Sequence, residues 1–332
     1  MDMETIPAAE FEERHKRRPR LALVNTTALM AMTFPPIRWI VPRYVPEGLS
    51  ILAGRQKLGK TWLAIDWAIA VACGGAAMGS IFCEKGDVLY IDMENGQRRI
   101  QRRIRTIFPS QMNQPDLSRL RWLCEAPALA GGFIEALEGW FAAVVKPRLI
   151  VVDVFQRVKP PARPRQNSYE SDYAALSPLQ TWATEKKLAV VCLHHVRKGG
   201  AEDPLEALSG SNGLSACANT TLVLDRKGAG TTLYVRGRDV EEKETALRFD
   251  GGLWTLIGEA ADVRRSTERG IILAALEGAG EPMSPAEISG VTGMKSGNTR
   301  KLLHSMGKAG EVRKTGRGLY DLAGRAAPNP SS

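Results

Sequence analysis

The residues with the most specific spacing in this chain lie between positions 54 and 61. They read Gly-Arg-Gln-Lys-Leu-Gly-Lys-Thr, which fits the pattern G-x-x-x-x-G-K-[ST] at every fixed position. Glycines let the backbone curl so that successive N–H groups point into one concavity, which suits an anion. The pattern predicts a phosphate-binding loop that holds a nucleotide with Gly54, Arg55, Gln56, Lys57, Leu58, Gly59, Lys60, Thr61 and Trp62.

Two side chains of this loop indicate what it binds. Lys60 begins a helical pattern over residues 60–73 and places a point charge for the β- and γ-phosphates, and Thr61 supplies a hydroxyl to Mg²⁺. The alternative is a chance glycine-rich turn, but an apolar strand at 49–53 precedes the loop and a helix follows it. We therefore expect ATP and Mg²⁺ as cofactors.

A carboxylate at the end of another apolar strand completes the predicted metal site. The run 148–153 reads Arg-Leu-Ile-Val-Val-Asp, the Walker B form, and we expect it on a strand next to the phosphate loop. Asp153 would hold Mg²⁺ together with Thr61. The alternative is an aspartate that only caps a turn.

A second pair of acids follows the strand pattern at 87–92. Alternation places Asp92 and Glu94 on one face, with Glu94 furthest out at the carboxyl end of the strand. By analogy with other phosphate-loop sites, we expect Glu94 to act as the general base that activates water. The alternative is an acid that offsets the dipole of the helix predicted at 97–107.

Two adjacent histidines, His194 and His195, end the strand pattern at 188–194. Successive side chains on a strand face opposite ways, so the pair cannot bind one metal together. One of them is expected to sense the γ-phosphate, and the alternative is an ordinary polar strand end.

These residues need a scaffold that brings them together, and apolar strand patterns alternate with helical ones to provide it. The strands are expected at 49–53, 87–92, 120–124, 149–153 and 188–194, and the helices at 60–73, 97–107, 132–145 and 169–186. Such alternation predicts an α/β fold with a mainly parallel sheet. Four shorter strand patterns add antiparallel strands to one edge, at 219–225, 231–235, 245–249 and 253–257.

The order of these features resembles the RecA-like P-loop ATPases, and among them the RepA-type hexameric helicases and their AAA-labelled relatives. The resemblance covers residues 35–258 and is most specific at 193–200, Leu-His-His-Val-Arg-Lys-Gly-Gly, and at 208–213, Leu-Ser-Gly-Ser-Asn-Gly. It implies that His195 rather than His194 is the γ-phosphate sensor.

The resemblance also implies nucleic-acid contacts and a ring. Loops at 197–204 and 209–216 would line a central channel, with Arg197 and Lys198 on single-stranded DNA. Arg236 would act as an arginine finger on the nucleotide of a neighbouring subunit. The alternative is a pair of solvated arginines, Arg236 and Arg238.

The last part of the chain has a different pattern. Helical segments at 266–278, 284–291 and 295–306 and a basic hairpin at 310–320 resemble the winged-helix family of DNA-binding domains. The resemblance implies contacts to duplex DNA, and docking to a protein is the alternative. The DNA-binding residues would be Lys295, Asn298, Arg300, Lys301, Arg313, Lys314 and Arg317.

Length and composition fit a soluble protein of about two domains. The chain has 332 residues, 44% of them hydrophobic and 24% charged, with a net charge of +9 that favours an anionic partner. Five scattered cysteines without a CxxC motif argue against a disulfide scaffold or zinc ribbon, and we expect a cytoplasmic protein. No apolar run is long enough for a membrane span, so no membrane partner is expected. The predicted parts are an arm at 1–47, the ATPase domain at 48–260, a linker at 261–263, the winged helix at 264–325 and a disordered tail at 326–332.

Together these features predict an ATP-dependent motor that acts on DNA. Its most concrete form is a hexameric replicative helicase or replication protein of a plasmid, phage or integrated element. The main alternative is a non-translocating ATPase switch that binds DNA as an initiator or regulator. A small-molecule phosphotransferase is a weaker alternative, because no substrate-pocket motif is present. The basic run over 98–105 is expected to be a solvated helix face, with DNA contact as its alternative.

Overall fold

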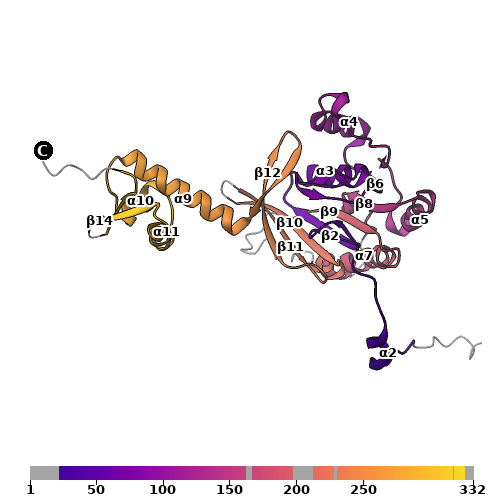
Figure 1. The fold of residues 1–332 in the computed structure, drawn as a ribbon. Coiled ribbons are helices and arrows are strands. Elements are labelled where there is room, and N and C mark those ends of the chain that lie inside the picture. The colour runs from indigo at the N-terminus through magenta and orange to yellow at the C-terminus, as the bar shows by residue number, and fades with distance from the viewer. Residues whose placement is uncertain (1–21, 162–166, 197–211, 228–229, 317, 326–332) are drawn as a thin grey trace, which may run out of the picture. The chain divides into compact units, whose positions relative to one another are not determined.

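The structure is a computed structural model, shown in Figure 1. It describes residues 22–161, 167–196, 212–227, 230–316 and 318–325. The chain divides into two units between Ile37 and Arg38. In the first unit, helix α2 (Thr26–Ala31) begins after Asn25, whose side chain accepts a hydrogen bond from the backbone N–H of Ala28. No residue of α2 is buried.

A nine-stranded sheet lies at the centre of the second unit, in the order β13-β12-β11-β10-β3-β9-β8-β6-β7. The six strands from β10 to β7 in this order are parallel, and β11, β12 and β13 extend the sheet with antiparallel pairing. The predicted mainly parallel sheet with antiparallel edge strands is confirmed. The strands are β3 (Gly48–Gly54), β6 (Asp87–Asp92), β7 (Leu120–Leu123), β8 (Pro147–Asp153), β9 (Ala189–His195), β10 (Thr220–Lys227), β11 (Gly230–Gly237), β12 (Lys243–Asp250) and β13 (Leu253–Glu259).

Helices cover both faces of this sheet, as Figure 1 shows. The central strands are apolar on both sides, so alternate residues enter two separate cores: Leu52 packs with α3 on one face, and Ile51 packs with α7 on the other. The helices of the ATPase part are α3 (Lys60–Cys73), α4 (Gly96–Ile107), α5 (Phe133–Ala143), α6 (Phe155–Val158), α7 (Ser168–Glu185) and α8 (Asn212–Cys217). Short pieces complete it: β4 (Ala76–Ala77), β5 (Ile81–Phe82) and the 3₁₀ turns Gln111–Asn113 and Leu129–Gly131.

The proline-rich stretch before β3 corrects one prediction. It was expected to lack regular structure up to residue 47, but β1 (Trp39–Val41) and β2 (Val45–Pro46) form a hairpin. Ile40 and Tyr44 are buried in the core that also holds α3. The prolines stand beside or at the end of the short strands, where a missing N–H costs little. Residues 38–47 therefore belong to the folded body.

The C-terminal part has its own core, built from three helices and a hairpin. These are α9 (Ala260–Ala279), α10 (Pro285–Thr292), α11 (Ser296–Lys308), β14 (Val312–Gly316) and β15 (Leu319–Leu322). The element order follows the prediction, and Ser284 with Glu287 forms the predicted capping box. The linker predicted at 261–263 is wrong, because α9 begins at Ala260 and runs through it. The predicted tail at 326–332 lies outside the described residues.

None of the helices in the described ranges is long and apolar enough to cross a membrane.

Candidate nucleotide-binding site

The phosphate loop connects β3 to α3, and two of its glycines are required by close contacts. A Cβ on Gly54 would lie 2.4 Å from the carbonyl oxygen of Leu224 on the adjacent strand β10. Gly59 has a φ of +99°, and a Cβ there would lie 2.8 Å from the ring of Trp254. The indole Nε1 of Trp254 donates to the carbonyl oxygen of Gly59 at 3.1 Å. The loop is therefore held from behind by β10 and β13, whereas Arg55, Gln56 and Lys57 are exposed.

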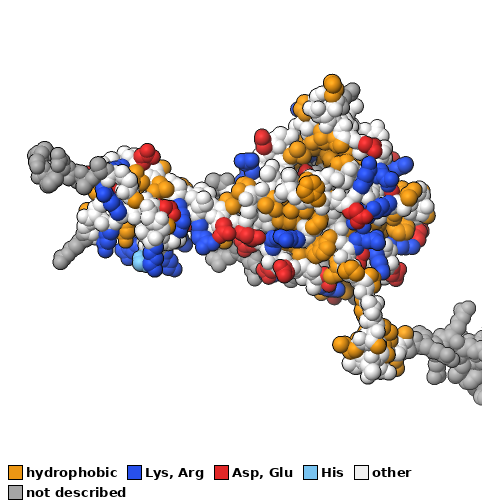
Figure 2. All heavy atoms as spheres, in the orientation of Figure 1, with side chains coloured by type: hydrophobic (Ala, Val, Ile, Leu, Met, Phe, Trp, Pro, Cys, Tyr) orange, Lys and Arg blue, Asp and Glu red, His pale blue; other side chains and the backbone are white. Residues whose placement is uncertain are grey.

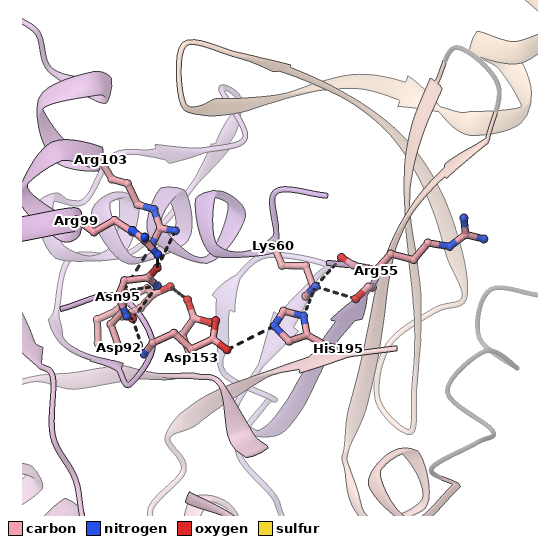
Figure 3. A network of polar contacts seen from close by, with 11 residues as sticks. Arg55, Lys60, Asp92, Asn95, Arg99, Arg103, Asp153 and His195 are labelled. Atoms are coloured by element: carbon pink, nitrogen blue, oxygen red, sulfur yellow. Dashed lines mark hydrogen bonds and ion pairs between the residues drawn. The ribbon is translucent and has the colours of Figure 1, made fainter. Parts of the chain in front are cut away.

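Lys60 is buried at the first position of α3, and its ammonium group is held by the loop itself. The Nζ atom donates to the carbonyl oxygens of Gly54 at 2.7 Å and Arg55 at 2.8 Å (Figure 3). Burial lowers the pKa of Lys60 to about 8, although the carboxylates of Asp153 and Glu94 act in the opposite direction. A phosphate group in the loop would take the place of these carbonyl oxygens and keep the lysine charged.

Asp153 ends β8 and is 1% exposed. The hydroxyl of Tyr90 donates to its Oδ2 atom at 3.0 Å, and the side chain of Thr61 is hydrogen-bonded to it as well. Burial, followed by the nearby Asp92, raises the pKa of Asp153 to about 6. The strand β9 lies between β3 and β8, so the expectation of adjacent strands is wrong, yet Thr61 and Asp153 still meet.

Glu94 and Asp92 do not share the role expected from their alternation. Asp92 is fully buried, and its Oδ1 atom accepts hydrogen bonds from the backbone N–H groups of Glu94 at 3.2 Å and Asn95 at 2.9 Å. Arg103 lies 3.6 Å from the other carboxylate oxygen of Asp92. Asn95 also accepts a hydrogen bond from Arg99 at 2.8 Å, which links this turn to α4 (Figure 3). Asp92 thus shapes the turn that presents Glu94.

The two histidines at the end of β9 have different surroundings. His195 Nδ1 lies 3.0 Å from Lys60 Nζ, and its Nε2 atom lies 3.8 Å from Glu94 Oε1, so this ring bridges the lysine and the carboxylate. Burial and the charge of Lys60 lower the pKa of His195, and Glu94 opposes them. His194 is separate from this group, and burial lowers its pKa to about 4. The structure therefore brings His195 and not His194 into contact with Lys60, and its sensor role stays a prediction.

The donor set fits a magnesium ion that is held mostly by nucleotide phosphates. Among the described residues, no group of three or more His, Cys, Asp or Glu side chains could enclose a metal without other ligands. Thr61 and Asp153 supply one hydroxyl and one carboxylate from two elements, which is how phosphate-loop proteins hold Mg²⁺. Mg²⁺ keeps several waters and binds through few protein ligands, so this small set is sufficient.

Arg236 lies at the other edge of the sheet. It pairs with Thr221 of β10, which pairs in turn with Ile51, three residues before the end of β3 at Gly54. Its guanidinium is 2.6 Å from Glu242 Oε1. Arg236 is therefore not part of the nucleotide site of its own chain, and its role in a neighbouring subunit stays a prediction.

Arg226 is a basic residue that the sequence did not single out. The parallel pairing of β10 with β3 ends at Leu224 opposite Gly54, and β10 continues past it to Lys227. Arg226 is thus exposed at the edge of the sheet where the phosphate loop lies, with its Nε atom 3.4 Å from Thr231 Oγ1. Only the register of β10 on β3 could have revealed this position.

The predicted DNA-binding residues fall into three groups. In the C-terminal part, Figure 2 shows Lys and Arg side chains gathered on one side. The exposed members are Lys295, Arg300, Lys301 and Lys314, and Asn298 is half-buried. Arg313 is instead engaged internally, because its Nη2 atom lies 3.8 Å from the buried Asp321 and donates to the carbonyl oxygen of Arg325 at 2.5 Å. Arg197, Lys198 and Arg317 lie outside the described residues.

Comparisons with known proteins agree with this geometry. The profile of a family described as an AAA domain matches residues 14–201, more than half of the chain. The chain belongs to the AAA domain family. A search of curated proteins finds no match.

The fold is also shared with a solved structure whose title describes it as an ATPase domain. The two chains are 16% identical with a TM-score of 0.50, and the match covers 75% of this AAA domain protein and 96% of that chain. At this identity the likeness establishes the fold, which is the RecA-like α/β fold of P-loop ATPases.

Proposed function

We propose that this AAA domain protein is an ATP-hydrolysing motor that acts on DNA, most concretely a hexameric replicative helicase or replication protein. One observation carries the proposal: Lys60, His195 and Glu94 form a continuous line of contacts at the phosphate loop. A phosphate grip, a polar sensor and an exposed carboxylate are then within one side chain of each other. This is the arrangement that couples nucleotide hydrolysis to a response.

Each residue of the site has a separate task in this mechanism. Lys60 and the loop N–H groups bind the β- and γ-phosphates, and Glu94 takes a proton from the attacking water. Thr61 and Asp153 hold Mg²⁺, which neutralises the charge that develops on the phosphates. His195 contacts both Lys60 and Glu94, so a change at the γ-phosphate reaches β9 and the segment that follows it.

DNA as the partner rests on charge and on the resemblance of the sequence to RepA-type helicases. The C-terminal part exposes a basic helix and hairpin, and the net charge of the whole chain is +9. Single-stranded DNA would occupy the channel of a ring, and duplex DNA would contact α11. We retain the non-translocating ATPase switch as the second candidate, because a separate C-terminal core suits site recognition without movement.

The first test measures nucleotide binding and hydrolysis. Calorimetry with Mg²⁺ should detect ATP binding by the wild-type protein and not by Lys60→Ala. Glu94→Gln should bind ATP but hydrolyse it about 10²–10⁴-fold more slowly, as expected for loss of a general base. Full hydrolysis by both variants would contradict the assigned site.

The second test separates the two candidates with a forked DNA duplex. A motor separates the strands when ATP is present, and Glu94→Gln does not. If DNA stimulates hydrolysis while the strands stay paired under all conditions, the switch is correct and the helicase is wrong.

The third test concerns the arginine that acts in trans. Lys60→Ala and Arg236→Ala are each expected to be inactive, and their mixture should recover hydrolysis because one subunit supplies the lysine and its neighbour the arginine. Arg226→Ala serves as the comparison, since Arg226 lies at the phosphate-loop edge. If only the Arg226 variant is inactive alone and rescued by mixing, the finger is Arg226 rather than Arg236.

A further inference from the structure

Helix α4 carries a row of arginines that its own chain leaves without a counter-charge. Arg98, Arg102 and Arg105 are spaced by four and three residues, so they form one stripe, which we call the arginine ridge. All three are exposed, and within the described residues no acid lies within ion-pair distance of them. The helix has no acidic residue, and Arg98 stands in its first turn, where the helix dipole disfavours a cation. The ridge is thus costly to the isolated chain.

The turn between β11 and β12 carries the opposite charge. Residues 239–244 read Asp-Val-Glu-Glu-Lys-Glu, and we call them the acidic turn. Asp239, Glu241 and Glu244 are exposed, and no described base lies within ion-pair distance of these three. Glu242 is different because it pairs with Arg236. The acidic turn therefore presents three carboxylates against the three guanidinium groups of the ridge.

The two charged surfaces lie at opposite edges of the same sheet. Helix α4 begins directly after β6, at the carboxyl ends of the parallel strands. The acidic turn follows β11, whose last residue Gly237 pairs with Thr220 at the amino end of β10. Because the rigid sheet separates them, the ridge and the turn of one chain cannot meet.

We propose that the acidic turn of one copy of this chain docks on the arginine ridge of the next copy. Surfaces of opposite charge at opposite ends of one body make a head-to-tail contact, which repeats into a ring or a filament. This contact carries Arg236, which adjoins the acidic turn, to the edge of the neighbour where Glu94 and the phosphate loop lie. The proposal deepens the proposed function, on which its consequence for the nucleotide site rests.

Charge reversal on each surface tests the contact. Arg98→Glu with Arg102→Glu should weaken self-association at least about tenfold, because like charges then face each other. Asp239→Lys with Glu241→Lys should do the same. All four side chains are exposed, and neither pair includes Arg99 or Arg103, which contact the turn of Glu94. Arg121→Glu with Arg264→Glu changes the net charge of the protein as much as the ridge variant does and should assemble like the wild type.

Mixing the two reversed proteins gives the decisive measurement. In an equal mixture every contact between unlike chains again joins opposite charges, so native mass measurements should show assemblies of alternating subunits that neither protein forms alone. Wild-type assembly should also weaken between about 0.05 M and about 0.5 M salt, since exposed charges are screened. Unchanged assembly of either reversed protein, or no recovery on mixing, would overturn the proposal.

Two further outcomes distinguish this contact from DNA binding and from the ATPase activity. If the ridge variant keeps its assembly but loses affinity for single-stranded DNA, the ridge binds nucleic acid and the proposal is wrong. Lys60→Ala should still assemble without nucleotide. A protein that assembles through these charges but never binds ATP would disprove the proposed function and leave the contact standing.

Discussion

At the scale of single residues, the ammonium group of Lys60 connects acidity to nucleotide binding. Burial lowers its pKa to about 8, and phosphates bind the charged form. A lysine with a lowered pKa loses its proton as the pH rises through that value. We therefore expect the affinity for ATP to fall between about pH 8 and pH 9, and calorimetry at fixed Mg²⁺ measures it. The weak residual affinity of Lys60→Ala should stay constant over this range; an equal decline in that variant would assign the effect to another group.

Tyr90 offers a second residue-scale prediction. Its hydroxyl holds one oxygen of Asp153, so Tyr90→Phe frees that carboxylate to rotate. Partners of metal-binding side chains are worth about tenfold or more in metal affinity. We expect the Mg²⁺ or Mn²⁺ requirement to rise by that factor, measured by Mn²⁺ resonance in the nucleotide complex. Nucleotide affinity in the presence of a chelator should not change, and a loss there would show that the fold and not the metal is affected.

The sequence predicted Lys60, Thr61 and Asp153 because their types follow a fixed spacing around a strand and a loop. It could not predict Tyr90, since one hydroxyl inside an apolar strand leaves no pattern. The same holds for Asp92, which alternation placed beside Glu94 but which the turn buries completely.

At the scale of elements, the hairpin of β12 and β13 supports the phosphate loop through Trp254. Gly59→Ala places a Cβ 2.8 Å from that ring in addition to a strained φ of +99°. We expect a loss of about 2–4 kcal/mol in unfolding free energy, of which strain is about 1–2. Trp254→Phe should restore part of the loss in the double variant, because the smaller ring removes the clash.

Gly132 supplies the matched control for this prediction. It has the same φ of +99°, and a Cβ there would meet only the Glu135 carboxylate at 3.9 Å. Gly132→Ala should therefore cost the strain alone. Denaturant unfolding of the three single variants and the double variant measures both parts, and equal losses at Gly59 and Gly132 would show that Trp254 does not restrict the loop.

Most elements followed from periodicity. The helix Lys60–Cys73 and the strand Asp87–Asp92 have the predicted bounds, because each apolar run ends at a glycine, a charge or a turn. The hairpin of β1 and β2 was missed, since prolines conceal strands of two or three residues whose stability comes from tertiary packing. Ile40, Val41, Tyr44 and Val45 supply that packing.

At the scale of the whole molecule, the boundary at Ile37 predicts how truncations behave. A protein that starts at residue 38 should keep its unfolding free energy within about 0.5 kcal/mol and its ATP affinity, because α2 buries nothing. A protein that starts at residue 48 loses four buried side chains, each worth about 1.5–3 kcal/mol, and should not fold stably. Thermal unfolding of both measures this; equal stability would return the boundary to residue 47.

The relation between distant charges could not be predicted from the sequence. Arg98 and Glu241 each look like an ordinary surface residue when read along the chain. Their places at opposite edges depend on the strand order and on the direction of β11, which only pairing reveals.

The strand β13 joins two parts of this protein that look separate along the sequence. Trp254 touches the phosphate loop, and six residues later Ala260 begins the long helix of the basic C-terminal part, with no coil between strand and helix. Six residues of strand span about 20 Å. A displacement of Gly59 therefore meets no slack on its way along the chain, and the backbone acts as a push rod between the fuel chamber and the stalk of the terminal helices.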